Sequence, residues 1–245
     1  MTSISWSVDW KEAGPETDQI ERFWPGSNVR YSAGHRQSGK ARDLVRLAEA
    51  RRSRIPRGRI AIMATTPELR AQLRSAFTWR GDRWDDSYLA DVTGWWRDPK
   101  LLVQLGPALA ELHRHREPTV ILGLQSRGSL LGPLVAQSLG VGFVEVRKEP
   151  SPAADSDDWV EVTTPPDYRD RHLTLGFRRR LVVPEDRVLL VDDWIDTGGQ
   201  ALGTRALVTE VGASWIGVAV VVDALSDHAI RRDLSVKCLV HVREL

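Results

Sequence analysis

One stretch of the chain combines two adjacent acids with a turn of small residues. The acids are Asp192 and Asp193, and the turn contains Thr197, Gly198 and Gly199. An apolar run precedes the acids, and a segment with helical periodicity follows the turn. Small residues leave backbone N–H groups exposed, and a helix N-terminus attracts anions, so the turn predicts a phosphate site. Carboxylates beside it suit ribose hydroxyls and Mg²⁺. An ordinary turn between a strand and a helix is the alternative, but such a turn does not require paired acids next to Thr-Gly-Gly.

A second stretch carries cations and another small turn. Ser126, Arg127 and Gly128 follow an apolar run and precede a helical segment, and the next apolar run ends in Arg147 and Lys148. Guanidinium and ammonium groups are the usual side-chain partners of phosphate. The alternative for Arg147 and Lys148 is a solvated strand end.

These residues need a scaffold that brings them together, and the hydrophobic pattern supplies one. We expect strands at 119–124, 142–147, 172–178, 187–192, 215–222 and 236–242, with helices at 129–139 and 199–211. Strands that alternate with helices predict an α/β fold, a mostly parallel twisted sheet flanked by helices. Ligands of such sheets bind beyond the carboxyl ends of the strands. Both turns and the Arg-Lys pair lie at such ends, so we expect one shared anionic site, with a loop over 149–170.

Further elements are predicted upstream. Thr66-Pro67-Glu68 has the pattern of a helix start, and this helix is expected to run to about residue 77. Asp98-Pro99 predicts the start of another helix. A strand over 60–64 and a basic helix over 38–54 are also expected, the latter with a solvated face.

Composition bounds the class of protein. The chain has 245 residues, 42% of them hydrophobic, with a net charge of +1, which is typical of a globular protein. It has no apolar run of 18 residues and no basic-then-apolar start, so we expect no membrane span, no secretory signal and a cytoplasmic location. The single cysteine, Cys238, is expected to be a small buried apolar residue. The histidines have no metal-ligand spacing.

The acid-rich stretch from Arg187 to Gln200 resembles the phosphoribosyl-pyrophosphate (PRPP) motif of the type I phosphoribosyltransferases. The second stretch is similar to adenine phosphoribosyltransferases in its Ser-Arg-Gly turn, in Gly132-Pro133, in its Ala-Gln-x-Leu-Gly helix end and in the Arg-Lys pair. Residues 90–99 resemble that family's entry into its first core helix. The resemblance covers 89–245.

The resemblance implies a role for each site residue. The 5′-phosphate of PRPP would be bound by the loop residues, namely Asp196, Thr197, Gly198, Gly199, Gln200 and Ala201. Asp192 and Asp193 would bind the ribose hydroxyls, directly or through Mg²⁺, the expected cofactor. The pyrophosphate would be bound by Ser126, Arg127, Gly128, Arg147 and Lys148, with Arg127 acting catalytically at the leaving group. Asp196 is either a catalytic proton acceptor near the base or only a cap of the phosphate loop, and the sequence leaves both open.

The chain departs from the adenine enzymes at several positions. Ala90 stands where Arg is expected, Gly176 where a Glu helps to polarise the base, and Gln200 where Thr or Ser is usual. The PRPP side of the motif set is therefore more complete than the adenine side. The acceptor base and the retention of catalysis stay open.

The resemblance implies an enzyme that transfers phosphoribosyl from PRPP to a purine or purine-like base, in purine salvage, as a homodimer. The alternatives are a PRPP-sensing regulator whose basic N-terminal region contacts nucleic acid, and the same chemistry on a non-purine acceptor. Residues 1–88 form an extension, expected to build part of a hood over the base with aromatic residues such as Trp79, Trp84, Trp95 and Trp96. A P-loop-like string at 34–40 lacks the Ser/Thr after its lysine and is taken as chance.

Overall fold

The computed structural model describes residues 67–81, 89–150, 158–164 and 172–245. The chain divides into two units, Met1–Gly58 and Arg59–Leu245, and every described residue belongs to the second. The helix expected at 38–54, the strand at 60–64 and Trp84 lie outside the described residues.

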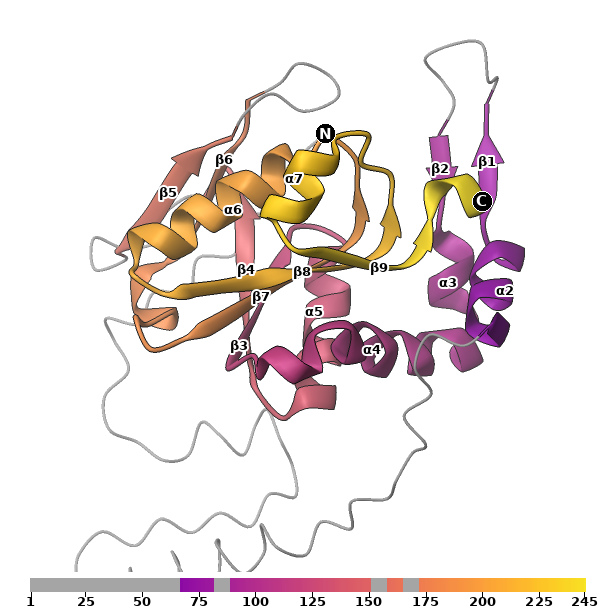
Figure 1. Ribbon diagram of the computed structural model, residues 1–245, viewed down its shortest axis with the longest axis horizontal. Helices are drawn as coiled ribbons and strands as arrows, with labels where there is room; N and C mark the ends of the chain where they lie inside the picture. Colours follow the sequence, from indigo (N-terminus) through magenta and orange to yellow (C-terminus); the bar gives the residue numbers. More distant parts are fainter. Residues whose placement is uncertain (1–66, 82–88, 151–157, 165–171) are drawn as a thin grey trace, which may run out of the picture. The chain divides into compact units, whose positions relative to one another are not determined.

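Within these residues, seven strands form one sheet in the order β5-β6-β4-β3-β7-β8-β9 (Figure 1). Their bounds are β3 Val120–Leu124, β4 Gly142–Lys148, β5 Trp159–Thr163, β6 Thr174–Arg178, β7 Arg187–Ile195, β8 Ser214–Asp223 and β9 Val236–His241. The five strands from β4 to β9 in this order are parallel to one another, whereas β6 and β5 are antiparallel at one edge. The sheet is mixed and mostly parallel, which confirms the predicted fold class.

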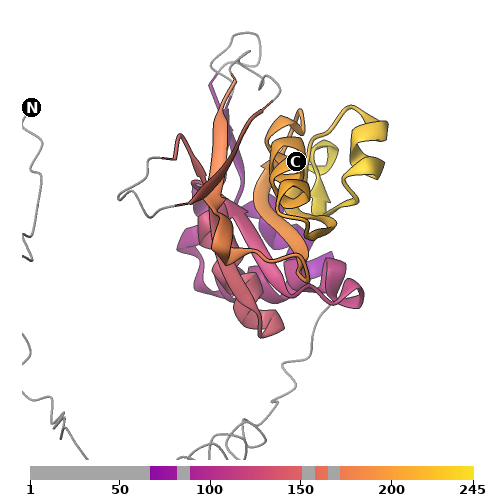
Figure 2. The ribbon, with the colours of Figure 1, turned by 90° about the vertical axis from the view of Figure 1, so that its left-hand side faces the viewer.

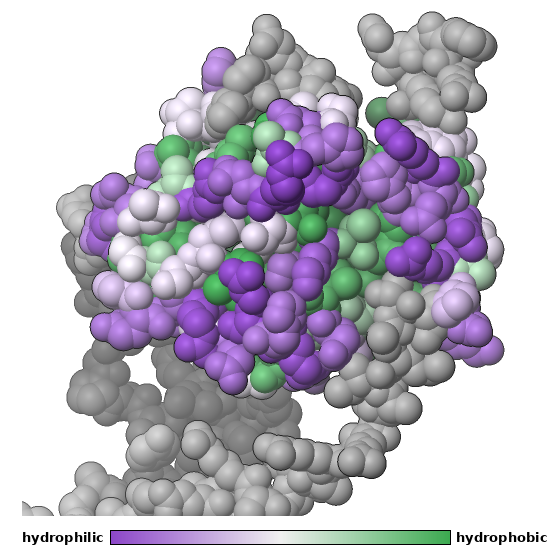
Figure 3. Space-filling view, in the orientation of Figure 1, coloured by the Kyte–Doolittle hydropathy of each residue, from purple (hydrophilic) through white to green (hydrophobic). Residues whose placement is uncertain are grey.

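Helices cover both faces of this sheet. Helices α4 (Pro99–His113) and α5 (Gly128–Leu139) pack on one face, and α6 (Gly199–Glu210) and α7 (His228–Asp233) pack on the other (Figures 1 and 2). Hydrophilic side chains cover the outside of α6 and α7 (Figure 3). In the part of the chain that the structure describes, no helix has the length and apolarity to cross a membrane.

The central strand β7 shows why the two faces are both apolar. Leu189 and Val191 are fully buried against the α4 and α5 side, while Val188 and Leu190 are fully buried against the α6 side. Alternate residues of a strand point to opposite faces, so a strand covered on both sides reads as a continuous apolar run. That run made β7 predictable from the sequence.

Two expectations are corrected at the strand level. Strand β7 continues to Ile195, beyond the predicted end at residue 192, so Asp193 also lies inside the strand, between Asp192 and Trp194, which both pair with β8. The predicted loop over 149–170 contains β5, which alternates in burial and pairs only with β6 at the sheet edge. Cys238 is half-buried and packs on the α6 side of the sheet.

The segment before the sheet is part of the same core. Helix α2 (Pro67–Ser75) begins at the predicted proline, and strands β1 (Thr78–Arg80) and β2 (Leu89–Asp91) form a separate antiparallel pair. Leu69, Leu73 and Phe77 are buried in the cluster that α4 and α5 share with the sheet. The short helix α3 (Thr93–Arg97) follows β2. Helix α4 starts as predicted, with the Asp98 carboxylate accepting a hydrogen bond from Lys100 N at 2.8 Å.

Candidate active site

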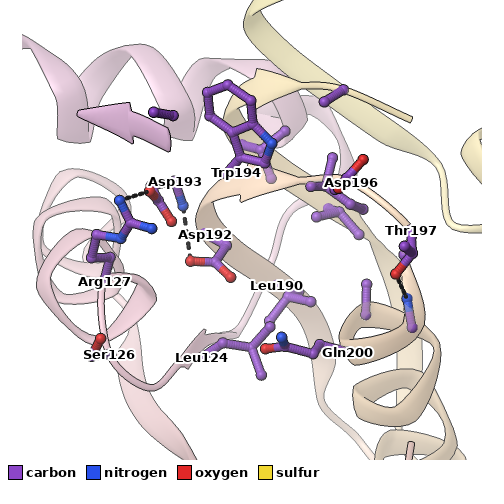
Figure 4. Close-up of a pocket in the computed structure, with 18 of the residues that line it drawn as sticks. Leu124, Ser126, Arg127, Leu190, Asp192, Asp193, Trp194, Asp196, Thr197 and Gln200 are labelled. Carbon is purple, nitrogen blue, oxygen red and sulfur yellow. Dashed lines mark hydrogen bonds and ion pairs between the residues drawn. The ribbon is translucent and has the colours of Figure 1, made fainter. Parts of the chain in front are cut away.

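A pocket of about 800 Å³ opens at the carboxyl ends of β3, β4 and β7 (Figure 4). It is lined by most of the residues that the sequence singled out: Ser126, Arg127, Lys148, Asp192, Asp193, Asp196, Thr197, Gly198, Gly199, Gln200 and Ala201. Elements separated by more than fifty residues in the chain thus meet at one sheet edge, as parallel topology requires. Gly128 and Arg147 are not among the lining residues.

Gly128 has a packing role in the structure. A Cβ atom at this position would lie 2.7 Å from the carbonyl oxygen of Val191 and 3.2 Å from Asp192 Oδ1. The absence of a side chain therefore lets the N-terminus of α5 approach β7 closely. This approach brings Arg127, the residue before Gly128, next to the acid pair.

Arg147 and Lys148 point to different sides of β4. Lys148 lines the pocket, whereas Arg147 lies near Glu145, with 3.9 Å between Arg147 Nε and Glu145 Oε2. Adjacent residues of a strand project to opposite faces, so the two cations leave β4 on different sides, and Lys148 is the one that lines the pocket. Lys148 is also fixed through its backbone, because its N–H donates to Gln125 Oε1 at 3.0 Å.

In the acid pair of the pocket, Asp193 is buried and Asp192 is partly buried. Asp193 is 4% exposed, and Arg127 Nη1 lies 3.0 Å from its Oδ2 (Figure 4). Asp192 accepts a hydrogen bond from Asp193 N at 2.9 Å. Burial raises the pKa of Asp193, although Arg127 acts in the opposite direction. Burial, together with the charge of Asp193, raises the pKa of Asp192 well above its ordinary value. We call Arg127, Lys148, Asp192 and Asp193 the charged wall.

One buried oxygen of the charged wall lacks a hydrogen bond. Asp193 Oδ2 has the Arg127 guanidinium at ion-pair distance but no hydrogen bond of good geometry. Buried carboxylate oxygens normally have donors or cations as partners. A ligand hydroxyl or a bound cation would satisfy this atom, and carboxylate oxygens are the ligands that Mg²⁺ prefers. Among the described residues, no three His, Cys, Asp or Glu side chains are grouped as a metal site, so Mg²⁺ would need oxygens from water and substrate as well.

The loop over 196–200, which we call the 196–200 loop, ends in the N-terminus of α6. Gly198 is the N-cap residue with φ of 80°, a left-handed conformation that favours glycine, and it has no side chain with which to cap the helix. Gly199 N donates to Thr197 Oγ1 at 3.3 Å. Asp196 is not the N-cap residue of α6; it lines the pocket, and partial burial raises its pKa.

On the aromatic side of the pocket, sequence reasoning named Trp79 but missed Trp194 and Phe77. Trp79 and Trp194 line the pocket, with their rings edge to face at 6.0 Å between centroids. Phe77 contacts both rings, with 5.1 Å between its ring centroid and that of Trp79 and 6.2 Å between its centroid and that of Trp194. We call Phe77, Trp79 and Trp194 the aromatic wall. Trp194 directly follows the acid pair, and its place on the strand that carries the acids was the available signal.

The other expected aromatic residues have different positions. Trp95 is fully buried and donates through Nε1 to Leu73 O at 3.0 Å, and Trp96 is partly buried against the same core. Leu89 and Ala90 of β2 complete the lining beside the aromatic wall, and Ala90 pairs with Trp79 across the β1–β2 ladder. The segment before residue 91 thus supplies part of one pocket wall.

Comparison with known proteins agrees with this geometry. The family model "Phosphoribosyl transferase domain" matches residues 97–243. The adenine phosphoribosyltransferase of Natranaerobius thermophilus is 33% identical over 132 residues, which are 53% of this chain and 72% of that protein.

Solved structures of adenine phosphoribosyltransferases are also similar. The Rhodothermus marinus protein is 28% identical with a TM-score of 0.62, over 72% of this chain and 100% of that chain. The Trypanosoma brucei protein, solved in complex with AMP, pyrophosphate and ribose-5-phosphate, is 26% identical with a TM-score of 0.61, over 74% of this chain and 82% of that chain.

Proposed function

The chain belongs to the phosphoribosyl transferase domain family and is a PRPP-dependent pentosyltransferase, and from this premise we propose that its acceptor is a purine or purine-like base. The observation that supports the site assignment is the convergence of the charged wall and the 196–200 loop on one pocket. Purine salvage is the process in which such an enzyme would act.

We assign the parts of PRPP by chemistry. The N–H groups of the 196–200 loop and the N-terminus of α6, with Thr197, Gln200 and Ala201 beside them, would bind the 5′-phosphate. Asp192 and Asp193 would accept hydrogen bonds from the ribose hydroxyls or bind Mg²⁺ that bridges to them. Ser126, Arg127 and Lys148 would bind the pyrophosphate. Asp193 Oδ2 would gain the hydrogen bond that it lacks in the free protein.

In the reaction, the bond from the ribose carbon to pyrophosphate breaks and a bond to a ring nitrogen of the base forms. Negative charge grows on the leaving pyrophosphate, and Arg127 and Lys148 are held where they would stabilise it. Mg²⁺, when bound, would supply further charge stabilisation there. Asp196 would accept the proton that the base loses, a role that its raised pKa favours because proton affinity is higher than for a solvated Asp.

The base would lie against the aromatic wall. Flat rings such as Trp79 and Trp194 suit a planar heterocycle. A Glu like that of the adenine enzymes has no room at Gly176, where a Cβ would lie 2.8 Å from Val160 O. Ala90 leaves the other expected position without a charge. These differences are why we propose a purine-like base and do not restrict it to adenine.

We propose that residues 67–81 and 89–91 act as part of the hood over the base, since Trp79, Leu89 and Ala90 line the pocket. We also propose that residues 1–88 form an extension of the phosphoribosyltransferase core, which covers residues 89–245. The homodimer and the cytoplasmic location stay predictions; analytical ultracentrifugation checks the first.

The test is a panel of bases with PRPP and Mg²⁺, read by pyrophosphate release. We expect turnover with at least one purine or purine analogue. PRPP with Mg²⁺ should also stabilise the fold, by about 2.7 kcal/mol at 100 times its dissociation constant. Stabilisation by PRPP with no turnover on any base would favour the PRPP-sensing regulator, and absence of any thermal shift at millimolar PRPP would refute PRPP binding.

A further inference from the structure

An ion pair between a buried acid and a partly buried arginine lies outside the pocket lining. Asp223, at the end of β8, is 3% exposed, and Arg231 of α7 binds it through two nitrogens. Arg231 Nε lies 2.6 Å from Asp223 Oδ2, and Nη2 lies 3.2 Å from Oδ1. This two-pronged geometry fixes the orientation of both side chains.

The same arginine holds the turn between β8 and α7. Arg231 Nη2 donates to the carbonyl oxygen of Leu225, and Nη1 lies 2.6 Å from His228 Nδ1. Asp223 Oδ1 also accepts from Leu225 N at 2.9 Å. Asp227 caps α7 through Ala229 N. The ion pair thus makes five contacts: two between its own side chains and three to Leu225 and His228. Together with the Asp227 cap, these contacts determine where α7 lies relative to β8.

Helix α7 lies directly against the 196–200 loop. A Cβ atom on Gly198 would be 2.9 Å from Ile230 Cγ2 and 3.4 Å from Leu225 Cδ2. Gly198 is the residue that turns the backbone into α6. Any shift of Ile230 or Leu225 would therefore move the backbone N–H groups that precede α6.

Stability alone is a weak reason for such a pair. A buried ion pair is often no more stabilising than apolar residues of the same volume, because both charges lose their hydration. Its directional contacts do fix geometry, and a phosphate cradle depends on geometry: a misplacement of about 1 Å lowers rates by up to about 10²-fold.

We propose that the Asp223–Arg231 ion pair is a positioning device for the 196–200 loop, setting the affinity for the 5′-phosphate without contacting the ligand. The inference rests on the proposed function, which assigns the 5′-phosphate to this loop. It predicts that loss of Arg231 weakens binding of the phosphate held by the loop and spares binding of pyrophosphate on the charged wall.

The experiment measures dissociation constants of the full chain for ribose 5-phosphate and, separately, for pyrophosphate with Mg²⁺. The variants are Arg231→Ala, Arg231→Lys and, as matched control, Arg232→Ala, which removes the same charge from an exposed position of the same helix. In Arg231→Ala, ribose 5-phosphate binding should weaken about 10- to 100-fold. Pyrophosphate binding should stay within about twofold, and Arg232→Ala should leave both constants unchanged. If Arg231→Ala does not fold, Arg231→Lys decides, because it keeps the charge but not the two-pronged contact.

Equal weakening of both ligands would show a general loss of structure and would overturn the inference. Unchanged ribose 5-phosphate binding in Arg231→Ala, or in Arg231→Lys where only that variant folds, would also overturn it. If the unmodified protein binds neither ligand, the proposed function is wrong and the inference falls with it.

Discussion

The charged wall and the aromatic wall face the same pocket but differ in what they do for the fold. In the charged wall, burial raises the pKa values of Asp192 and Asp193, and Asp193 Oδ2 has no hydrogen bond. In the aromatic wall, Phe77, Trp79 and Trp194 pack on one another and on the main core. The first arrangement opposes folding in the absence of ligand, and the second favours it.

This difference predicts that substitutions will separate activity from stability on one wall and couple them on the other. The buried carboxylates of the charged wall lower the stability of the free protein, and a bound ligand removes this cost because it gives them partners. The apolar packing of the aromatic wall stabilises the fold both with and without ligand. Four changes test this comparison.

The largest effect should come from removing the segment that carries the aromatic wall. A chain starting at Ser87 loses Leu69, Leu73 and Phe77, which are buried in the core. Burial of each such side chain contributes about 1.5–3 kcal/mol, so the loss of about 5–9 kcal/mol approaches the whole stability of an ordinary domain. Circular dichroism should show no cooperative unfolding, and a folded, active product would contradict the coupling of this segment to the core.

The matched control is a chain starting at Arg59, the boundary between the two units. We expect it to fold and to bind PRPP like the full chain. Loss of acceptor turnover in this control alone would show that residues 1–58 belong to the base site.

Next in size is the Arg127→Ala change on the charged wall. Removal of one preorganised donor from a developing negative charge lowers turnover by about 10²–10³-fold. Arg147→Ala, a change of the same size at the end of a neighbouring strand but outside the pocket lining, should alter turnover by less than about twofold. Steady-state kinetics on both variants tests whether Arg147 binds pyrophosphate, as the resemblance implies, or does not, as the strand geometry indicates. Equal losses in the two would favour the resemblance.

A third change should improve stability at the expense of activity. Asp192→Asn removes the acid whose pKa is raised most clearly by burial and by the neighbouring carboxylate. We expect turnover to fall by about 10²-fold and the melting temperature of the free protein to rise.

The pH dependence of that change has a definite sign. An acid with a raised pKa in the fold binds its proton more tightly than in the unfolded chain, so it opposes folding above its folded pKa. This penalty is relieved as the pH falls through the folded pKa toward 3.8, the ordinary value. The stability gain of Asp192→Asn should therefore be full above the folded pKa of Asp192 and shrink as the pH falls through that pKa. A gain that grows on acidification would contradict the raised pKa.

The smallest effect should be at Trp194. Stacking of a base on an aromatic ring contributes about 1–3 kcal/mol, and leucine keeps part of that contact, so Trp194→Leu should raise the KM of the acceptor about tenfold. The KM of PRPP should not change, and the melting temperature should fall, because Trp194 also contacts Phe77. Trp96→Leu, which changes a partly buried ring outside the pocket, is the control. An unchanged acceptor KM in Trp194→Leu would remove the base from the aromatic wall.

Much of the fold was predictable because burial leaves a direct mark on the sequence. The run that forms β7 is apolar on both faces, and Pro67 and Asp98-Pro99 mark helix starts that the structure confirms. Strand β5 was missed because it is a short edge strand that directly follows an acidic stretch. Helix α7 has only six residues, and the Asp223–Arg231 ion pair holds it in place. This ion pair cannot be read from a local sequence pattern.

The site was predictable where a motif is local and not where it depends on packing. The acids, the 196–200 loop and the Ser126-Arg127 turn were identified from spacing, and the structure brings them to one pocket. The opposite directions of Arg147 and Lys148 followed from strand alternation and could have been inferred. The contact of Phe77 with Trp194 joins residues more than one hundred positions apart, and only the tertiary structure shows it.

The close approach at Gly128 has a consequence for how this protein can change by recombination or design. A Cβ there would meet the backbone of β7, at Val191, so the turn and the strand fit only as a pair. A library that exchanges the 125–128 turn between relatives should therefore exchange β7 with it. The chain offers more freedom at Arg147, which is exposed. Retargeting of the enzyme is best begun on the aromatic wall, with Gly128 and Val191 inherited together.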